Sequence, residues 1–173
     1  KHNTFWLSKS PDKVGSQLWY SLYPRICTTA VVELENGDKV RVYNTHLDCF
    51  LPQARDFGLK KLSQFIDKNR KEEKLPVIVM GDFNATPDSK IIKKFAAGEY
   101  NTDRFVAVQE VKRELYKKST MSKFKGKENG LHIDYIFVSE DLEIVDVDIV
   151  KYNDNGSYPS DHYPLIADIK IKK

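Results

Sequence analysis

The sequence predicts an α/β protein in which mixed β-sheets form a sandwich flanked by helices. Three observations predict this fold class. Short apolar, strand-like runs alternate with segments whose apolar residues recur at helical spacing. An Asn-Gly pair at residues 36–37 lies between two strand-like segments, which indicates a β-hairpin. The length of 173 residues, with 40% hydrophobic content, fits one domain with its own core.

The first half of the chain supplies the hairpin, a helix and a buried strand. Strands are expected at residues 28–34 and 39–44, on either side of the turn at 35–38. Residues 53–69 carry apolar side chains at roughly helical spacing. The apolar run 76–80 (Pro-Val-Ile-Val-Met) that follows is typical of a buried strand.

The second half of the chain is expected to complete the sheets. A short helix is expected over residues 89–95, and residues 102–116 are expected to be partly helical. Residues 117–130 are polar and rich in Gly, Lys and Ser, which predicts a loop beside the site. Further strands are expected at residues 133–138, 142–150 and 165–171.

Composition excludes little beyond membrane-spanning segments. The formal net charge of +3, in a chain with 31% charged residues, is too small to indicate nucleic-acid binding by itself. No apolar run reaches the length of a membrane span, so no integral membrane segment is expected. Cys27 and Cys49 have no metal-type spacing, and two buried free thiols are expected. These thiols leave the compartment open, with the cytoplasm slightly favoured.

The segment 81–84 (Gly-Asp-Phe-Asn) follows directly on the apolar run 76–80. It delivers a carboxylate and a carboxamide at a strand end, where open α/β sheets build their sites. Residues two apart in an extended segment point the same way, so Asp82 is a candidate to take a proton beside Asn84, which both donates and accepts hydrogen bonds. The alternative is a simple turn, since Gly, Asp and Asn are all common turn residues.

Three further clusters accompany that segment. The segment 160–162 (Ser-Asp-His) precedes an apolar strand and combines a carboxylate with an imidazole, which suits a hard cation and a titratable donor. The segment 44–47 (Asn-Thr-His-Leu) ends another strand. In the segment 132–138, Asp134 falls inside the strand expected at residues 133–138, where a buried carboxylate is costly unless it is paired. The economical partner is a histidine.

In order and spacing, the segments 44–47, 81–84, 133–137 and 160–162 resemble the motifs of the endonuclease/exonuclease/phosphatase family, the divalent-metal phosphodiesterases related to pancreatic deoxyribonuclease and the abasic-site endonucleases. The resemblance runs from about Phe5 to Ile171. It implies that residues 1–173 form a single domain with a four-layer deoxyribonuclease-like fold, and that the protein uses Mg²⁺ or Mn²⁺.

The resemblance also implies the role of each residue. Asp82 would orient or deprotonate the attacking water, and Asn84 would fix the phosphate. His162 would contact the phosphate, with its orientation and charge set by Asp134. His46 would donate to the phosphate or to the leaving group, with a structural histidine bonded to a backbone carbonyl as the alternative.

Asp161 would help to hold Mg²⁺ or Mn²⁺, hard ions that prefer oxygen ligands. Arg25 precedes a core strand and is a candidate to bind a phosphate in bidentate fashion, with a surface ion pair as the alternative. Asp48 lies at the rim and is assigned no role. His2 and His132 lie outside the motif positions, and structural roles are expected for both.

The family pattern also includes an N-terminal portion that carries an Asn and a metal-binding Glu. Residues 1–8 resemble a mid-domain strand of the family, so the chain is expected to lack the N-terminal strands. We therefore expect it to self-associate or to need the missing segment as a partner, and to bind Mg²⁺ poorly by itself.

The expected function is metal-dependent hydrolysis of phosphodiester or phosphomonoester bonds in a nucleic acid, a nucleotide or a phospholipid head group. The alternative is a catalytically incomplete fragment that binds phosphate or acts as a scaffold. Residues 84–89 resemble the deadenylase-like and uncharacterised bacterial branches of the family. The substrate stays open.

Overall fold

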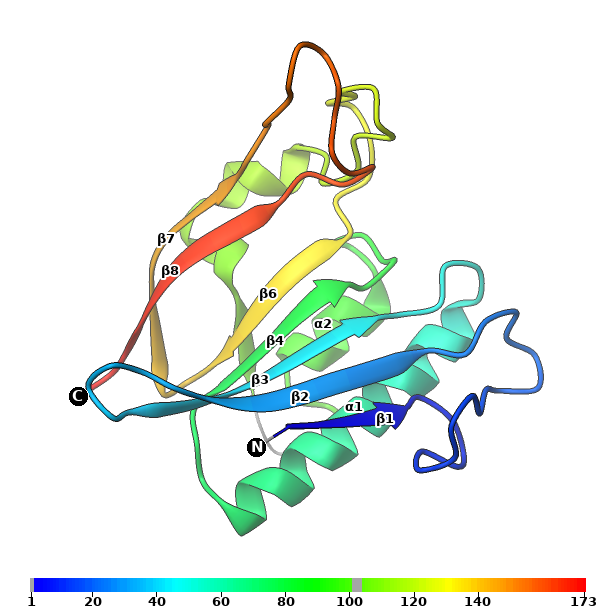
Figure 1. Cartoon of the computed structure of the whole chain (residues 1–173), viewed down its shortest axis with the longest axis vertical. Coiled ribbons are helices and arrows are strands. Elements are labelled where there is room, and N and C mark those ends of the chain that lie inside the picture. Colours follow the sequence, from blue (N-terminus) through cyan, green and yellow to red (C-terminus); the bar gives the residue numbers. More distant parts are fainter. Residues whose placement is uncertain (1, 101–103) are drawn as a thin grey trace.

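The computed structural model describes residues 2–100 and 104–173 and contains two β-sheets with helices (Figure 1). The larger sheet has six strands in the order β1-β2-β3-β4-β6-β5, and the smaller sheet pairs β7 with β8. All pairings are antiparallel except that of β3 with β4. The strands are β1 (His2–Trp6), β2 (Ile26–Glu33), β3 (Lys39–His46), β4 (Val77–Asp82), β5 (Phe105–Ala107), β6 (Asp134–Ser139), β7 (Leu142–Ile149) and β8 (Leu165–Ile171).

The α-helices cover one face of the larger sheet, and the smaller sheet packs on its other face together with buried residues of two 3₁₀ helices. The helices are α1 (Pro52–Glu72) and α2 (Lys90–Ala96), with two 3₁₀ helices, η1 (Val108–Val111) and η2 (Arg113–Lys117). One core fills the space between the helices and the sheet and contains Tyr43, Leu62 and Phe83. A second core lies between the two sheets and contains Val138, Val147 and Tyr163. The predicted layering of mixed sheets and helices is present.

The parallel pairing of β3 and β4 follows from the helix between them. Strand β3 ends at His46, α1 runs back along the sheet, and β4 then starts beside the beginning of β3. Helix α1 begins with Pro52 at its first position, where a missing backbone N–H costs nothing. This βαβ arrangement places the carboxyl ends of both strands at the same edge of the sheet, where sites form in α/β proteins.

Two expectations from the sequence are met only in part. The partly helical segment expected at residues 102–116 contains the short strand β5 and then η1 and η2, while residues 102 and 103 lie outside the described part. Phe105 and Ala107 alternate with an exposed residue, which is strand periodicity. Cys49 is exposed, so the expectation of two buried thiols was wrong, although Cys27 is buried and both thiols are free.

No helix in the described residues is both long and apolar enough to cross a membrane.

Candidate active site

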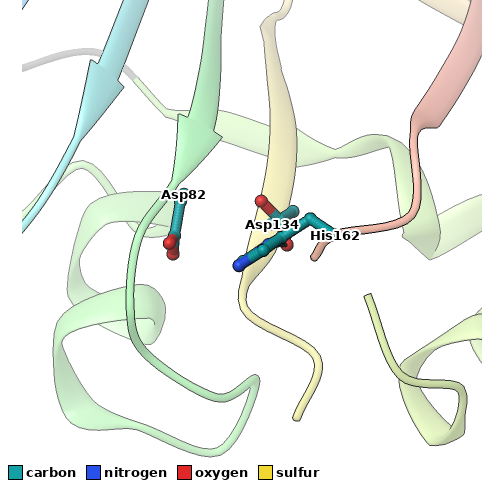
Figure 2. A group of neighbouring side chains, drawn as sticks. All are labelled: Asp82, Asp134 and His162. Carbon is teal, nitrogen blue, oxygen red and sulfur yellow. Dashed lines mark hydrogen bonds and ion pairs between the residues drawn. The ribbon is translucent and has the colours of Figure 1, made fainter. Parts of the chain in front are cut away.

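Three neighbouring strands bring His46, Asp82 and Asp134 into one row at the edge of the larger sheet. In the parallel pairing of β3 and β4, His46 lies beside Asp82. In the antiparallel pairing of β4 and β6, Asp82 lies opposite Asp134. Residues far apart in the sequence therefore become neighbours through register alone. Figure 2 shows Asp82 at the end of β4 and Asp134 on the next strand, with His162 reaching over from the segment before β8.

Gly81 is required for this row to form. Its φ is +134°, a backbone conformation that residues with a side chain rarely adopt. A Cβ at this position would lie 1.8 Å from the carbonyl oxygen of Thr45 on β3. The glycine therefore lets β4 reach its end close beside β3, with Asp82 next to His46.

Asp82 is both a turn residue and a site residue. Its Oδ1 accepts a 2.7 Å hydrogen bond from the backbone N–H of Asn84, and Asn84 has the left-handed φ of +49° that asparagine tolerates. The Asn84 amide donates to the carbonyl of Leu47 at 3.1 Å. The turn interpretation of this segment and its site interpretation are thus compatible, because the turn fixes the direction of the carboxylate.

Asp134 and His162 form a hydrogen-bonded pair. Nδ1 of His162 donates to Oδ2 of Asp134 at 2.7 Å, and both side chains are about four-fifths buried, with exposures of 22% and 18%. The histidine partner that the sequence required for Asp134 is therefore His162. The hydrogen bond that His162 donates to Asp134 is the main cause that raises the pKa of His162, against the opposing effect of burial.

Residues of the loop at 117–130 hold this pair in place, and sequence reasoning missed them. Thr120 is fully buried, and its Oγ1 accepts hydrogen bonds from the backbone N–H groups of Ile133 and Asp134 at 3.0 and 3.2 Å. Its carbonyl accepts from the N–H of Tyr163 at 2.8 Å. Ser122 in turn donates to the carbonyl of Ser160 at 3.0 Å. One loop thus fixes both the start of β6 and the segment that carries His162.

A second imidazole lies on the other side of Asp82. Nε2 of His46 is 3.3 Å from Oδ2 of Asp82. Burial lowers the pKa of His46; the charge of Asp82 opposes this, and the charges of Arg25 and His162 add to it. Burial raises the pKa of Asp82, as does the charge of Asp134, while the hydrogen bond from Asn84 lowers it. The two histidines are therefore shifted in opposite directions.

The row is a candidate metal centre. Among the described residues, Asp82, Asp134 and His162 each offer one ligand atom, and these atoms lie within 4.8 Å of one another. The side chains of the two carboxylates are only 13% and 18% exposed, so their repulsion is poorly screened and calls for a neighbouring positive charge. Carboxylate oxygens suit Mg²⁺ or Mn²⁺. The residues present therefore fit a hard cation.

Asp161 and Arg25 lie outside this row. Asp161 is exposed and contributes its backbone carbonyl, which accepts from the N–H groups of Ser122 and Lys123 at 2.6 and 2.9 Å. Its carboxylate is not among the convergent ligand atoms of the described residues. Arg25 is half-buried and donates to the sulfur of Cys49 at 3.3 Å, so the expected alternative of a surface ion pair is not found in the described residues.

Two residues outside the row have structural roles. Asp48 is 2% exposed, and its oxygens accept from the backbone N–H groups of Phe50 and Leu51 and from the hydroxyl of Ser21. His132 is buried, donates from Nδ1 to the carbonyl of Lys118 at 3.0 Å and accepts at Nε2 from the Gln109 amide at 2.9 Å. The structural role expected for His132 is confirmed.

Comparison with known protein families gives a match over most of the chain. The model of the "Endonuclease/Exonuclease/phosphatase family" matches residues 6–162, which include the row and both histidine–carboxylate pairs. The chain belongs to the endonuclease/exonuclease/phosphatase family. The resemblance drawn from the four sequence segments is therefore confirmed. Enzymes of this family hydrolyse phosphoester bonds. A comparison with curated protein sequences finds no significant match.

Solved structures confirm the fold class. A mannosyl-6-phosphatase from Bacteroides thetaiotaomicron has a TM-score of 0.81 and 22% identity over 99% of this chain and 66% of its own. An endonuclease/exonuclease/phosphatase protein from Bacteroides vulgatus has a TM-score of 0.84 and 25% identity. The match covers 99% of this chain and 65% of that protein. The human Nocturnin catalytic domain with bound sulfate has a TM-score of 0.73 and 20% identity. The match covers 99% of this chain and 59% of that domain. This chain thus spans about two thirds, or less, of the length of these structures.

Proposed function

We propose that this protein is a Mg²⁺- or Mn²⁺-dependent hydrolase of phosphodiester or phosphomonoester bonds. The observation that carries the proposal is the row of His46, Asp82 and Asp134, with His162 hydrogen-bonded to Asp134. Phosphate-ester hydrolysis needs an activated water, donors to the phosphoryl oxygens and a stabilised leaving oxygen. The row offers a separate group for each need.

Asp82 is the group that takes a proton from the attacking water. The turn bond from Asn84 occupies Oδ1, which leaves Oδ2 directed toward His46 and the open edge of the sheet. The raised pKa of Asp82 brings the carboxyl closer to neutral pH, where a general base is most effective. Asn84 uses one amide hydrogen on Leu47 and keeps the other for a phosphoryl oxygen.

His162 is the cationic donor to the phosphate. Its pKa is raised by Asp134, so the imidazole carries its charge to higher pH, and Nε2 stays available because Nδ1 is bonded. His46 has a lowered pKa and is the neutral donor beside the leaving oxygen. Asp82 and Asp134 are the carboxylates that would hold the metal, and the exposed Asp161, whose carboxylate lies outside this convergent group, is the further oxygen ligand expected from the sequence. When bound, the ion neutralises charge on the phosphoryl group.

The test uses two chromogenic substrates, p-nitrophenyl phosphate and bis-p-nitrophenyl phosphate. We expect release of nitrophenol with Mg²⁺ or Mn²⁺, and loss of release with a chelator or with Asp82→Asn. Asp38→Asn, in the exposed hairpin between β2 and β3, is the matched control and retains activity. Turnover that persists in the chelator would contradict metal dependence.

A second candidate is a module that binds phosphate esters without hydrolysing them. The observation that favours it is that both convergent carboxylates already have hydrogen-bond or ion-pair partners, which leaves few oxygens for a metal. Such a module binds phosphate in calorimetry but releases no nitrophenol at any metal concentration. The two candidates are thus separated by turnover alone.

A further inference from the structure

Two connections meet beside His46 and display aromatic side chains. One is the connection between β1 and β2, residues 7–25, and the other connects β3 with α1, residues 47–51; they lie next to each other in Figure 1. The rings of Tyr23 and Phe50, one from each connection, have their centroids 6.5 Å apart. Both are exposed, at 54% and 59%. Apolar rings that face solvent next to a catalytic row need an explanation.

Asp48 fixes the two connections relative to each other. Its Oδ2 accepts from the hydroxyl of Ser21 at 2.6 Å, and its Oδ1 accepts from the backbone N–H groups of Phe50 and Leu51 at 2.8 and 2.7 Å. A buried carboxylate with three donors holds a rigid geometry. The exposed rings of Tyr23 and Phe50 are therefore carried on a preorganised support.

Arg25 links this support to the row of site residues. Its guanidinium carbon lies 5.9 Å from the centre of the Tyr23 ring, and one terminal nitrogen donates to Cys49. The carbonyl of Ile26, the residue after Arg25, accepts a 2.9 Å hydrogen bond from the hydroxyl of Thr45, the residue before His46, so Arg25 lies beside the end of β3. Nε of Arg25 is buried and has no hydrogen-bond partner, and no carboxylate of the described residues pairs with it. The cation is therefore left with unsatisfied hydrogen-bonding capacity next to His46.

Charged side chains are few around Arg25. In residues 14–26 and 47–54 the charged residues are Arg25 and the buried Asp48, and the guanidinium of the adjacent Arg55 is engaged by donating to the carbonyl of Asp48 at 3.0 Å. Nucleic-acid strands are bound along tracks of basic residues that follow their phosphates. One cation bordered by aromatic and hydroxyl side chains suits a ligand that has one phosphate and an uncharged remainder.

The arrangement of the two rings indicates which chemical group the uncharged part of the ligand contains. Tyr23 and Phe50 are tilted by 32° and already contact each other, so they leave no slot in which a base would stack between them. Their exposed outer faces form a one-sided apolar platform. A sugar ring presents one such apolar face and places its hydroxyls at the edge, within reach of donors such as Arg25.

We propose that Tyr23, Phe50 and Arg25 form a subsite for the sugar of a small sugar phosphate, which would make this chain selective for sugar monophosphates over nucleic acid. The proposal rests on the proposed phosphate-ester hydrolysis at the neighbouring row. In this arrangement the phosphate lies between Arg25 and His162, and the sugar ring packs on Phe50.

The test compares a hexose 6-phosphate with glycerol 3-phosphate, which has the phosphate but no ring. We expect a higher kcat/KM for the hexose 6-phosphate. Phe50→Ala should lower the ratio of the two values by about tenfold, the size of one lost ring contact. Tyr152→Ala removes a tyrosine with similar exposure, 61%, outside the two connections, and should leave the ratio unchanged. Phe50 is exposed, so its truncation does not threaten the core.

Binding measurements test the same subsite without any need for turnover. In calorimetry with a chelator present, Phe50→Ala should weaken the hexose phosphate, and Arg25→Ala should weaken both hexose phosphate and inorganic phosphate. An unchanged ratio in Phe50→Ala overturns the subsite, as does better hydrolysis of an oligonucleotide or a nucleoside monophosphate. Absence of all turnover with ring-selective binding intact would instead contradict the proposed hydrolase.

Discussion

Asp82 and Asp134 are register partners at the adjoining ends of β4 and β6, and each carboxylate has an imidazole of its own. Asp82 faces His46 at 3.3 Å, and Asp134 accepts from His162 at 2.7 Å. The two pairs differ in burial and hydrogen bonding, so the pKa of His46 is lowered and the pKa of His162 is raised. When the environments of two histidines shift their pKa values in opposite directions, one histidine suits a neutral role and the other a cationic role.

Removing the carboxylate partner should lower the pKa of His162. The hydrogen bond that His162 donates to the Asp134 carboxylate is the largest cause of the upward shift, so Asp134→Asn should move the pKa toward or below the ordinary histidine value of about 6.5. NMR titration of the imidazole protons, with a chelator present, measures the shift. Asp154→Asn, in an exposed turn, is the control. An unchanged pKa would mean that the pair contributes nothing to the charge of His162.

The same pair should contribute to stability in a defined pH window. Because the folded-state pKa of His162 is raised, its stabilising contribution is fully present below the unfolded pKa and is lost as the pH rises through the folded pKa. The difference in free energy of unfolding between the wild type and Asp134→Asn should therefore shrink toward alkaline pH. Urea unfolding at several pH values measures it, and a difference that grows with pH would contradict this sign.

Asp82→Asn should abolish most turnover and keep the fold. Loss of a general base lowers turnover by about 10²–10⁴-fold. Asparagine retains an oxygen that accepts the N–H of Asn84, so the turn persists. The pKa of Asp82 is raised in the fold, so this carboxyl lowers the stability of the folded state as the pH rises above its unfolded pKa, and replacing it should not destabilise the protein at neutral pH. Steady-state kinetics measures the loss of turnover, and thermal unfolding measures whether stability is kept. Full activity of Asp82→Asn would show that Asp82 has no part in the mechanism.

His162 and Asp134 should act as a unit in catalysis. If Asp134 works through the imidazole, the losses in log kcat/KM of the two single alanine variants should exceed the loss of the double variant when summed. A full double-mutant cycle measures this coupling. The pair of His162 with Asp38, which lies in the hairpin between β2 and β3, should give additive losses and serves as the control cycle. Additivity in the first cycle would show that the two residues are not partners.

The strands and α1 were predictable because each has its own local pattern. The buried strand at residues 76–80 and the helix at 53–69 show periodicity that packing then uses. The sequence Asp-Phe-Asn at residues 82–84 likewise marks the point where β4 ends. What no local pattern contains is the register that sets His46, Asp82 and Asp134 side by side, because register depends on pairing between distant segments.

Other features depended on tertiary contacts that single residues do not announce. Thr120 lies in a polar stretch that predicts a loop, and only the fold buries its hydroxyl against the start of β6. Cys49 follows a core strand, but Asp48 turns the chain outward by accepting the N–H groups that come next, which leaves the thiol exposed. The three-residue β5 is too short for its alternation to outweigh the helical spacing around it.

Gly81→Ala should disrupt the row and the fold together. The added Cβ would meet the carbonyl of Thr45, and φ at this position is +134°, so β4 must move away from β3. We expect a loss of more than about 3 kcal/mol in the free energy of unfolding. Gly37→Ala is the matched control, because its φ is also positive but nothing lies within 4 Å of the added Cβ, so about 1 kcal/mol is expected. Equal losses in urea unfolding would contradict the steric argument.

Residues 1–173 should self-associate through the apolar surface where the two sheets diverge. A cavity of about 690 Å³ opens there, lined by Val32 and Leu34 of the β2–β3 hairpin region and by Ile169 and Ile171 of β8. Val32 and Leu34 are 44% and 43% exposed, and β8 pairs only with β7 among the described strands, so one backbone edge is open. Exposed apolar faces next to an open edge favour pairing with another chain.

Sedimentation velocity across a concentration series should show dimers or larger species, and Val32→Lys with Leu34→Lys should shift the distribution to monomer. Val111→Lys, at an equally exposed valine on η1, should leave association unchanged. A monodisperse wild-type monomer at high concentration would show that this surface is tolerated in water.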